Sequence, residues 1–321
     1  MKIGILLPYK ENFSPEYPGA VSLFVYETSL RSKYKNDITV FGSTKYKKKV
    51  KIKYKNIELF NNLLRSQTKL YVKKFLDLQK KFDFSILEIH NRPSYINILK
   101  DKLPNKILSL YFHNDPLSMD GSKTVEDRKN LLKSCYRIIF NSNWSKKRFL
   151  NGLENKFVNS EKLVVFFQSA KKNNKSILNN KKKWITFVGK LNTAKGYDVF
   201  AKSIKKILNK YPNWKAKIIG DEKREKIILK HKNADVLGFQ NHGKVLEIFK
   251  KTSIAVACSR WEEPFGRTSL EAASRGCAVI ISNRGGLPET SKNAIILKNL
   301  STEELYKKIE NLITNKKLLL K

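Results

Sequence analysis

Residues Trp184–Gly220, WITFVGKLNTAKGYDVFAKSIKKILNKYPNWKAKIIG, decide the fold class of this chain. Trp184–Gly189 is a short apolar run, Val199–Lys210 repeats apolar residues at helical spacing, and Ala216–Gly220 is a second apolar run. A strand, a helix and a further strand in this order form a unit in which the two strands lie parallel in one sheet. The stretch therefore predicts an α/β protein with a parallel sheet.

The same alternation runs along nearly the whole chain. Amphipathic stretches such as Leu59–Lys80, Trp144–Leu153 and Lys244–Thr252 separate short runs rich in Val, Ile and Leu. Strands of this composition are typical of parallel sheets that helices cover on both faces. The predicted strands are Lys2–Pro8, Ile38–Gly42, Phe84–His90, Lys106–His113, Arg137–Ser142, Leu163–Phe167, Trp184–Gly189, Ala216–Gly220, Ala234–Gly238, Ile254–Cys258 and Ala278–Ser282.

One stretch breaks the alternation. Lys171–Lys183, KKNNKSILNNKKK, lacks a sustained apolar period, as expected of an interdomain linker. We predict an amino-terminal domain over residues 1–170, a linker over 171–183, a carboxyl-terminal domain over 184–300 and a helix over 301–321. Whether this helix returns to the amino-terminal domain is left open. Two such α/β halves should enclose a cleft, with ligands at the carboxyl ends of the strands.

Composition sets limits on the class of protein. With 41% hydrophobic residues in 321, the chain can bury real cores, which excludes a wholly disordered protein. No apolar run has the length of a membrane span, and the start of the chain does not resemble a signal peptide. Cys135, Cys258 and Cys277 have no paired spacing, which argues against a disulfide framework and a zinc cluster. We therefore expect a soluble cytoplasmic protein.

The net charge of +37 comes from 65 basic and 28 acidic residues. The excess is mainly lysine spread over the chain, which argues against a nucleic-acid partner, because base readers rely on arginine. The densest tract, Lys45–Lys55, alternates lysine with apolar and aromatic residues. This pattern fits an edge strand with a solvated lysine face, and it also fits a patch held against an anionic membrane.

A stretch suited to binding an anion follows the predicted strand Ile254–Cys258. In Ser259–Glu271, SRWEEPFGRTSLE, a Pro–Gly turn leads into a helix whose first N–H groups form a ready phosphate site. Glu263 and Glu271 flank this site, and carboxylates beside an anion site are good acceptors for sugar hydroxyls. The alternative, which we weigh equally at this point, is one carboxylate favouring the helix dipole and a second on the surface.

A second stretch, Phe187–Gly196, leaves the carboxyl end of the preceding strand. Lys190 and Lys195 there can clamp a diphosphate and neutralise the charge on a leaving group. In a chain this rich in lysine, the alternative is that both side chains are simply solvated.

In combination, Gly189–Gly196, Glu263–Ala272 and Gly276–Glu289 resemble the motifs of the group 1 (family four) retaining glycosyltransferases. The resemblance is close over Trp184–Glu289 and looser over residues 1–168. It implies the GT-B fold, in which two Rossmann-like, doubly wound parallel-sheet domains face a central cleft. Glu263 and Glu271 match the E-x7-E motif of the family.

The resemblance also implies roles for matched positions. Lys190, Lys195 and the backbone around Gly266 would bind the donor diphosphate, Glu263 the donor sugar, and Glu271 the ribose. The turn at Gly19 resembles a donor-phosphate loop, although an ordinary strand-to-helix turn also explains it. The donor-binding residues implied are Gly19, Lys190, Lys195, Gly238, Phe239, Phe265, Gly266, Arg267 and Glu271, with the nucleobase beside Gly238 and Phe239.

Two of the four histidines end predicted strands. A lone histidine is more often structural than functional, but two at strand ends on one sheet shift that balance. His113 matches the family histidine that contacts the donor sugar, so His113 and Glu263 are the predicted catalytic residues. His90, Asn91 and Arg92 are predicted on the acceptor side, and His231 and His242 are interpreted as surface residues.

The resemblance implies retention of configuration, no metal, and no cofactor besides a nucleotide-sugar donor, for which a UDP-sugar is our choice. The expected acceptor is a glycan or lipid-linked saccharide of the cell envelope, which would place the protein at the inner face of the membrane. Two alternatives stay open: a non-catalytic GT-B scaffold that binds anionic lipid or nucleic acid, and a nucleotide-sugar epimerase.

Overall fold

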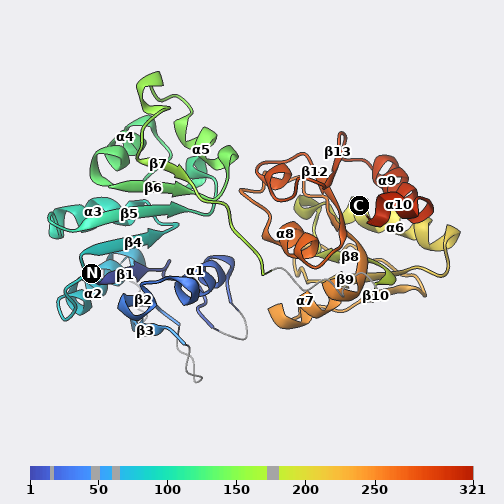
Figure 1. Ribbon diagram of the computed structural model, residues 1–321, viewed down its shortest axis with the longest axis horizontal. Helices are drawn as coiled ribbons and strands as arrows, with labels where there is room; N and C mark the ends of the chain where they lie inside the picture. The colour runs from blue at the N-terminus through green and yellow to red at the C-terminus, as the bar shows by residue number, and fades with distance from the viewer. Residues whose placement is uncertain (15–17, 45–50, 60–65, 172–180, 321) are drawn as a thin grey trace. The chain divides into compact units, whose positions relative to one another are not determined.

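The computed structural model describes residues 1–14, 18–44, 51–59, 66–171 and 181–320 (Figure 1). The chain divides into two compact units, Met1–Phe167 and Gln168–Lys321. Each contains one fully parallel sheet, as the sequence predicts. Among the described helices, none combines the length and apolar character that a membrane span requires.

The amino-terminal unit contains a seven-stranded sheet in the order β3-β2-β1-β4-β5-β6-β7. Its strands are β1 (Ile3–Leu6), β2 (Ile38–Gly42), β3 (Lys53–Asn56), β4 (Ile86–His90), β5 (Ile107–Phe112), β6 (Arg137–Phe140) and β7 (Leu163–Val165). Its helices are α1 (Ala20–Arg31), α2 (Gln67–Gln79), α3 (Ser94–Lys102), α4 (Val125–Ser134) and α5 (Asn143–Leu150). One core layer includes Phe41, Phe75 and Leu110, and another, which includes Phe24 and Val40, lies on the side of α1.

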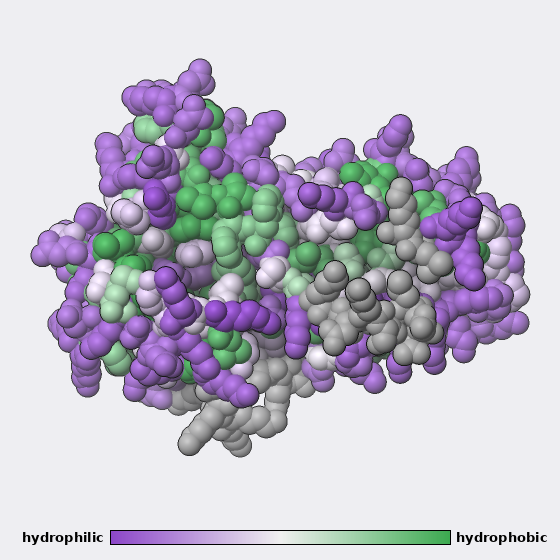
Figure 2. Space-filling model, viewed as in Figure 1, coloured by the Kyte–Doolittle hydropathy of each residue, from purple (hydrophilic) through white to green (hydrophobic). Residues whose placement is uncertain are grey.

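The lysine tract ends in an edge strand. Residues 45–50 lie outside the described residues, but β3 pairs only with β2 and exposes Lys53 and Lys55. The edge-strand interpretation is therefore confirmed for the described part of the tract. Hydrophilic side chains cover much of the visible face of both units (Figure 2).

The carboxyl-terminal unit contains a six-stranded sheet in the order β10-β9-β8-β11-β12-β13. The chain order reverses beside β8, and ligands bind at such switch points in open parallel sheets. The strands are β8 (Lys182–Val188), β9 (Lys215–Ile219), β10 (Ala234–Val236), β11 (Thr252–Ala257), β12 (Ala278–Ser282) and β13 (Ile295–Leu297). The helices are α6 (Tyr197–Lys210), α7 (His242–Lys251), α8 (Arg267–Ser274), α9 (Thr302–Thr314) and α10 (Lys316–Leu320).

The last long helix, α9, packs within this carboxyl-terminal unit. Its apolar face contributes Leu305, Ile309 and Leu312 to the same core as α6. Ser203 donates a hydrogen bond to the Thr302 carbonyl, 2.8 Å away, so the two helices are also joined at one end. Residues 172–180 of the predicted linker lie outside the described residues, while residues 182 and 183 already belong to β8.

Candidate active site

Two loops leave the sheet at the switch point between β8 and β11. The first loop turns through Asn192, whose side-chain oxygen accepts a hydrogen bond from the Lys195 amide at 3.0 Å. Gly196 follows with φ of 69°, and a Cβ there would lie 1.8 Å from the carbonyl oxygen of Cys258. Only glycine tolerates both the left-handed backbone and this contact. The first loop is thereby pressed against the start of the second.

Backbone bonds fix the two loops together. The amides of Arg260 and Trp261 both donate to the Ala194 carbonyl, at 2.9 and 3.0 Å. The Arg260 guanidinium forms an ion pair with Asp198, on the first turn of α6. These bonds hold the Lys195 backbone close to the loop that carries Glu263.

Lys195 and Glu263 form an ion pair through Nζ and Oε1. The Glu263 side chain is only 15% exposed and that of Lys195 33% exposed, so the pair is largely shielded from water. The Glu263 carbonyl accepts a 2.6 Å bond from the Gly286 amide. At Gly285, where φ is 58°, a Cβ would lie 2.1 Å from that carbonyl oxygen, which makes glycine necessary. The sequence prediction that Glu263 and Lys195 belong to one site is consistent with this contact.

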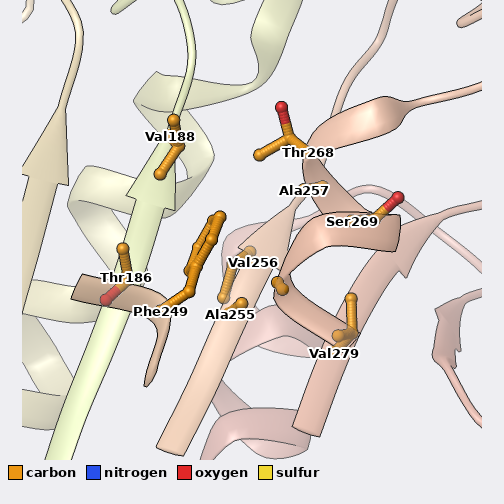
Figure 3. Close-up of a pocket in the computed structure, with 10 residues that line it drawn as sticks. Thr186, Val188, Phe249, Ala255, Val256, Ala257, Thr268, Ser269 and Val279 are labelled. Carbon is orange, nitrogen blue, oxygen red and sulfur yellow. The ribbon is translucent and has the colours of Figure 1, made fainter. Parts of the chain in front are cut away.

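Helix α8 begins directly after this loop. Its N-cap is Gly266, with φ of 96°, and a Cβ there would clash with Leu287. The N-cap residue Gly266 has no side chain with which to cap the helix. Beneath its first turn lies a crevice too narrow for water, in which Phe249 packs beside Val256 and faces the side of Thr268 (Figure 3). The first turn of α8 therefore packs mainly on apolar side chains, with no room for water beneath it.

Glu271, on the next turn of α8, is buried and accepts two hydrogen bonds at Oε1. Arg267 Nε donates at 2.7 Å and His242 Nε2 donates at 2.9 Å. Burial raises the pKa of Glu271, but the His242 bond and the Arg267 charge outweigh it and hold this pKa below the ordinary value. The interpretation of His242 as a surface residue is wrong: it opens α7 and its side chain is 24% exposed. Proximity of α7 to α8, rather than local sequence, brings it to Glu271.

The remaining predicted donor residues lie around this cluster. Gly238 has φ of 63°, and its carbonyl accepts a bond from the Gly220 amide at 2.9 Å. Phe239, three residues after the end of β10, is 58% exposed. Phe265 is buried, and Lys190 is exposed. The assignment of these residues to phosphate and nucleobase remains a prediction.

In the amino-terminal unit, the structure brings His90 and His113 together. His90 Nδ1 and His113 Nε2 are 2.9 Å apart, and both side chains are buried. Asn91, with φ of 56°, accepts hydrogen bonds at its side-chain oxygen from the amides of His113 and Asn114. Arg92 donates to the Asn91 carbonyl at 2.7 Å. The Asn91 amide group thus shapes the turn after β5, and its predicted contact with an acceptor stays a prediction.

Gly19 precedes α1 and touches Glu11. A Cβ at Gly19 would lie 2.1 Å from Glu11 Oε1, which accepts a hydrogen bond from the Ser22 amide at 2.8 Å. A carboxylate therefore sits at the N-terminus of α1, and burial raises its pKa. This contact gives Gly19 a packing role, as in an ordinary strand-to-helix turn. Its role beside a donor phosphate remains a prediction, and Glu16 and Tyr17 lie outside the described residues.

The sequence of this chain is similar to that of known proteins. Residues 168–321 match the profile of the family described as Glycosyl transferases group 1. Spore coat protein SA of Bacillus subtilis (strain 168) is 24% identical over 268 residues, which cover 74% of this chain and 71% of that protein.

Two solved structures share the fold over almost the whole chain. Anabaena Alr3699/HepE in complex with UDP-glucose aligns with a TM-score of 0.75 at 14% identity, covering 100% of this chain and 92% of that one. WaaG, a glycosyltransferase involved in lipopolysaccharide biosynthesis, aligns with a TM-score of 0.68 at 12% identity, covering 99% and 92%. At these identities the likeness concerns the fold.

Proposed function

We propose that this chain, whose residues 168–321 match the group 1 glycosyltransferases and whose two units have the GT-B fold, moves a sugar from a UDP-sugar to a glycan or glycolipid acceptor of the cell envelope, with retention of configuration. The observation that carries the donor side is the pair of cation–carboxylate contacts at α8. Lys195 contacts Glu263, and Arg267 contacts Glu271, on either side of the first turn of this helix.

This arrangement suits a nucleotide diphosphate joined to a sugar. A diphosphate needs cations and backbone N–H groups, which Lys195, Arg267 and the start of α8 supply. Ribose and sugar hydroxyls need acceptors, which Glu263 and Glu271 supply. Because each carboxylate lies beside a cation, the site can hold the charged and the hydroxyl-bearing parts of one molecule next to each other.

Uridine is proposed as the base, because UDP-glucose is bound by a protein of the same fold. Gly238 and the exposed ring of Phe239 form the surface on which we place it. Lys190, beyond β8, is proposed as a further phosphate ligand, with the amides of Phe265 and Gly266.

For the chemical step we propose a same-face displacement. The leaving phosphate, stabilised by Lys195 and the α8 N-terminus, takes the proton of the acceptor hydroxyl, while Glu263 and His113 bind the sugar. No metal is required in this proposal, because side-chain cations neutralise the leaving group.

Glycan or glycolipid is the acceptor class because WaaG, which shares the fold, acts in lipopolysaccharide biosynthesis. His90, Asn91 and Arg92 are the proposed acceptor-side residues, and the lysine-rich edge at β3 would hold the cytoplasmic enzyme at an anionic membrane surface.

Donor binding tests the proposal first. Calorimetric titration of UDP, GDP and ADP, with and without EDTA, should show UDP binding that EDTA leaves unchanged. Lys195→Ala and Glu271→Gln should each weaken that binding by at least 10-fold, and the surface variant Lys202→Ala, on the exposed side of α6, should match the wild type. Binding of GDP or ADP alone would refute uridine, and binding of none of the three would refute the donor site.

Transfer and stereochemistry need a second assay. UDP-sugars are incubated with the protein and a lipid-linked saccharide extract, and the anomeric configuration of the product is read by NMR. Retention of the donor configuration supports the displacement, and inversion refutes it. Salt-sensitive binding to anionic vesicles or DNA without any nucleotide binding would favour the non-catalytic scaffold instead.

A further inference from the structure

Three titratable side chains line up at the end of β4 and β5 in the amino-terminal unit. His90 Nδ1 lies 2.9 Å from His113 Nε2, and the ring centroids are 5.2 Å apart with planes inclined by 22°. The two rings therefore meet edge to edge through one hydrogen bond. Glu88, two residues before His90 on β4, places Oε2 3.7 Å from His90 Nε2. The order along this line is Glu88, His90, His113.

The side chains around Glu88, His90 and His113 offer these three groups few other hydrogen-bond partners. His90 Nε2 and His113 Nδ1 are both buried without a hydrogen bond to any described residue. The Tyr111 ring of β5 stacks on His90 at 4.5 Å, and Phe24 of α1 packs against His113 at 5.1 Å. Opposite Glu88, β1 presents the apolar Ile5. On its other side β5 presents Ser109, and the described titratable groups linked to this carboxyl are His90, through the 3.7 Å contact, and the Tyr111 phenol, on which its charge acts.

We propose that Glu88, His90 and His113 form a relay, electrostatic between Glu88 and His90 and hydrogen-bonded between the two rings, in which ionisation of the Glu88 carboxyl sets which nitrogen of His113 carries the proton. In a neutral imidazole one nitrogen donates and the other accepts, so a hydrogen bond at one nitrogen fixes the role of the other. The 2.9 Å bond between the rings transmits that choice from His90 to His113.

The two states follow from proton counting. When Glu88 is protonated and neutral, His90 Nδ1–H donates to His113 Nε2, and His113 Nδ1 carries a proton. When Glu88 is ionised, its negative charge 3.7 Å away favours the proton on His90 Nε2, so His113 Nε2–H donates to His90 Nδ1 and His113 Nδ1 is an acceptor. Three mobile protons become two, so one proton leaves and each of the two rings changes its tautomer.

The effect of burial on the pKa of each group agrees with these two protonation states. Burial raises the pKa of Glu88 to about 7 and lowers the pKa of His90 to about 3. Both rings therefore stay neutral while the Glu88 carboxyl titrates. Burial also raises the pKa of the Tyr111 phenol, which keeps it protonated. A quarter of the Glu88 side chain is exposed, so it can exchange its proton with water.

This inference rests on the proposed function in one respect, which is the contact of His113 with the donor sugar. In the ionised state the relay carries one negative charge and presents an acceptor at His113 Nδ1. The negative charge and the acceptor at His113 Nδ1 both favour a transition state in which positive charge develops on the sugar. Transfer should therefore speed up as the pH rises through 7, with Glu88 and His90 acting as positioning residues for His113.

The test measures tautomers in the nucleotide-free protein, so it does not depend on any donor. In protein labelled with 15N-histidine, ring-nitrogen shifts are followed from pH 5.5 to 8.5, with His113 assigned through variants of the other three histidines. The proton on His113 Nδ1 should disappear with a midpoint near pH 7. Glu88→Gln should abolish the transition, and Glu126→Gln, which changes an exposed carboxylate on α4, should leave it in place.

A second variant guards against a general disturbance of this region. His90→Gln should keep the Glu88 titration, seen by its side-chain carbonyl shift, but uncouple it from His113. A His113 tautomer that is constant with pH in the wild type, or a transition that persists in Glu88→Gln, overturns the relay. If donor binding fails while the tautomer transition is present, the proposed function is wrong and the relay stands. Where transfer is measurable, Glu88→Gln should flatten the pH profile of kcat and change UDP affinity less than 2-fold.

Discussion

Replacing His242 by alanine tests how the buried carboxylate of Glu271 is stabilised. The change removes the Nε2 donor that lies 2.9 Å from Glu271 Oε1 and leaves Arg267, at 2.7 Å, as its other donor. Glu271 is only 6% exposed, so water cannot fully replace the lost bond. We expect the free energy of unfolding to fall.

The size of the effect follows from the kind of bond. A hydrogen bond to a charged group contributes roughly 1.5–3 kcal/mol, and the retained Arg267 and the 24% exposure of His242 argue for the middle of that range, about 2 kcal/mol at pH 7. Because the folded pKa of Glu271 lies below its ordinary value of 4.5, this contribution is complete above pH 4.5 and is lost as the pH falls through the folded pKa. The difference between His242→Ala and the wild type should therefore shrink in acid.

Urea unfolding followed by tryptophan fluorescence measures the change, because Trp184, Trp214 and Trp261 all lie in the same unit as His242. His231→Ala is the matched control: the His231 ring bonds the Asn209 side chain at 3.1 Å at the surface, so its loss should cost less than about 1 kcal/mol. Equal losses in the two variants, or an undiminished difference at pH 3.5, would refute the reasoning.

Three further changes follow from the geometry. Glu88→Gln removes a carboxyl whose pKa is raised to about 7, so the wild type should lose up to roughly 3 kcal/mol of stability relative to this variant between pH 4.5 and 8, measured by urea unfolding at both pH values. Gly196→Ala should lower Tm sharply because of the clash with a backbone carbonyl, whereas Gly243→Ala, whose Cβ would make only an ordinary contact with the Asn241 side chain, should raise Tm or leave it unchanged. Burial raises the pKa of every cysteine thiol, so a thiol reagent at pH 8 should label none in the native protein and all after denaturation: Cys135, Cys258 and Cys277.

Periodicity was sufficient to predict the parallel α/β architecture, because buried parallel strands are continuous apolar runs that stand out from helices. It did not predict β13, Ile295–Leu297, which has three residues and is half exposed at the sheet edge. Its assignment depends on pairing with β12, which only the folded structure reveals.

Site residues that follow their own strand could be found from the sequence, whereas those recruited from a neighbouring element could not. Lys195 and Glu263 stand in recognisable motifs directly after β8 and β11. His242 opens α7 with no motif around it, and its contact with Glu271 depends on how α7 packs against α8. The same holds for Glu88, which looks like one acidic residue in a strand until β4 and β5 place it in line with two histidines.

The paired charges at α8 bear on how a donor would bind. Without a ligand, Lys195 and Arg267 already have carboxylate partners, so a diphosphate gains only the difference between its own contacts and those it weakens. The carboxylates freed in this exchange are not left unpaired, because hydroxyls of the same donor would bond to them. A free phosphate offers no such hydroxyls and leaves both carboxylates facing added negative charge. The arrangement therefore favours a molecule that carries diphosphate and sugar together, which is a discrimination that cations alone would not provide.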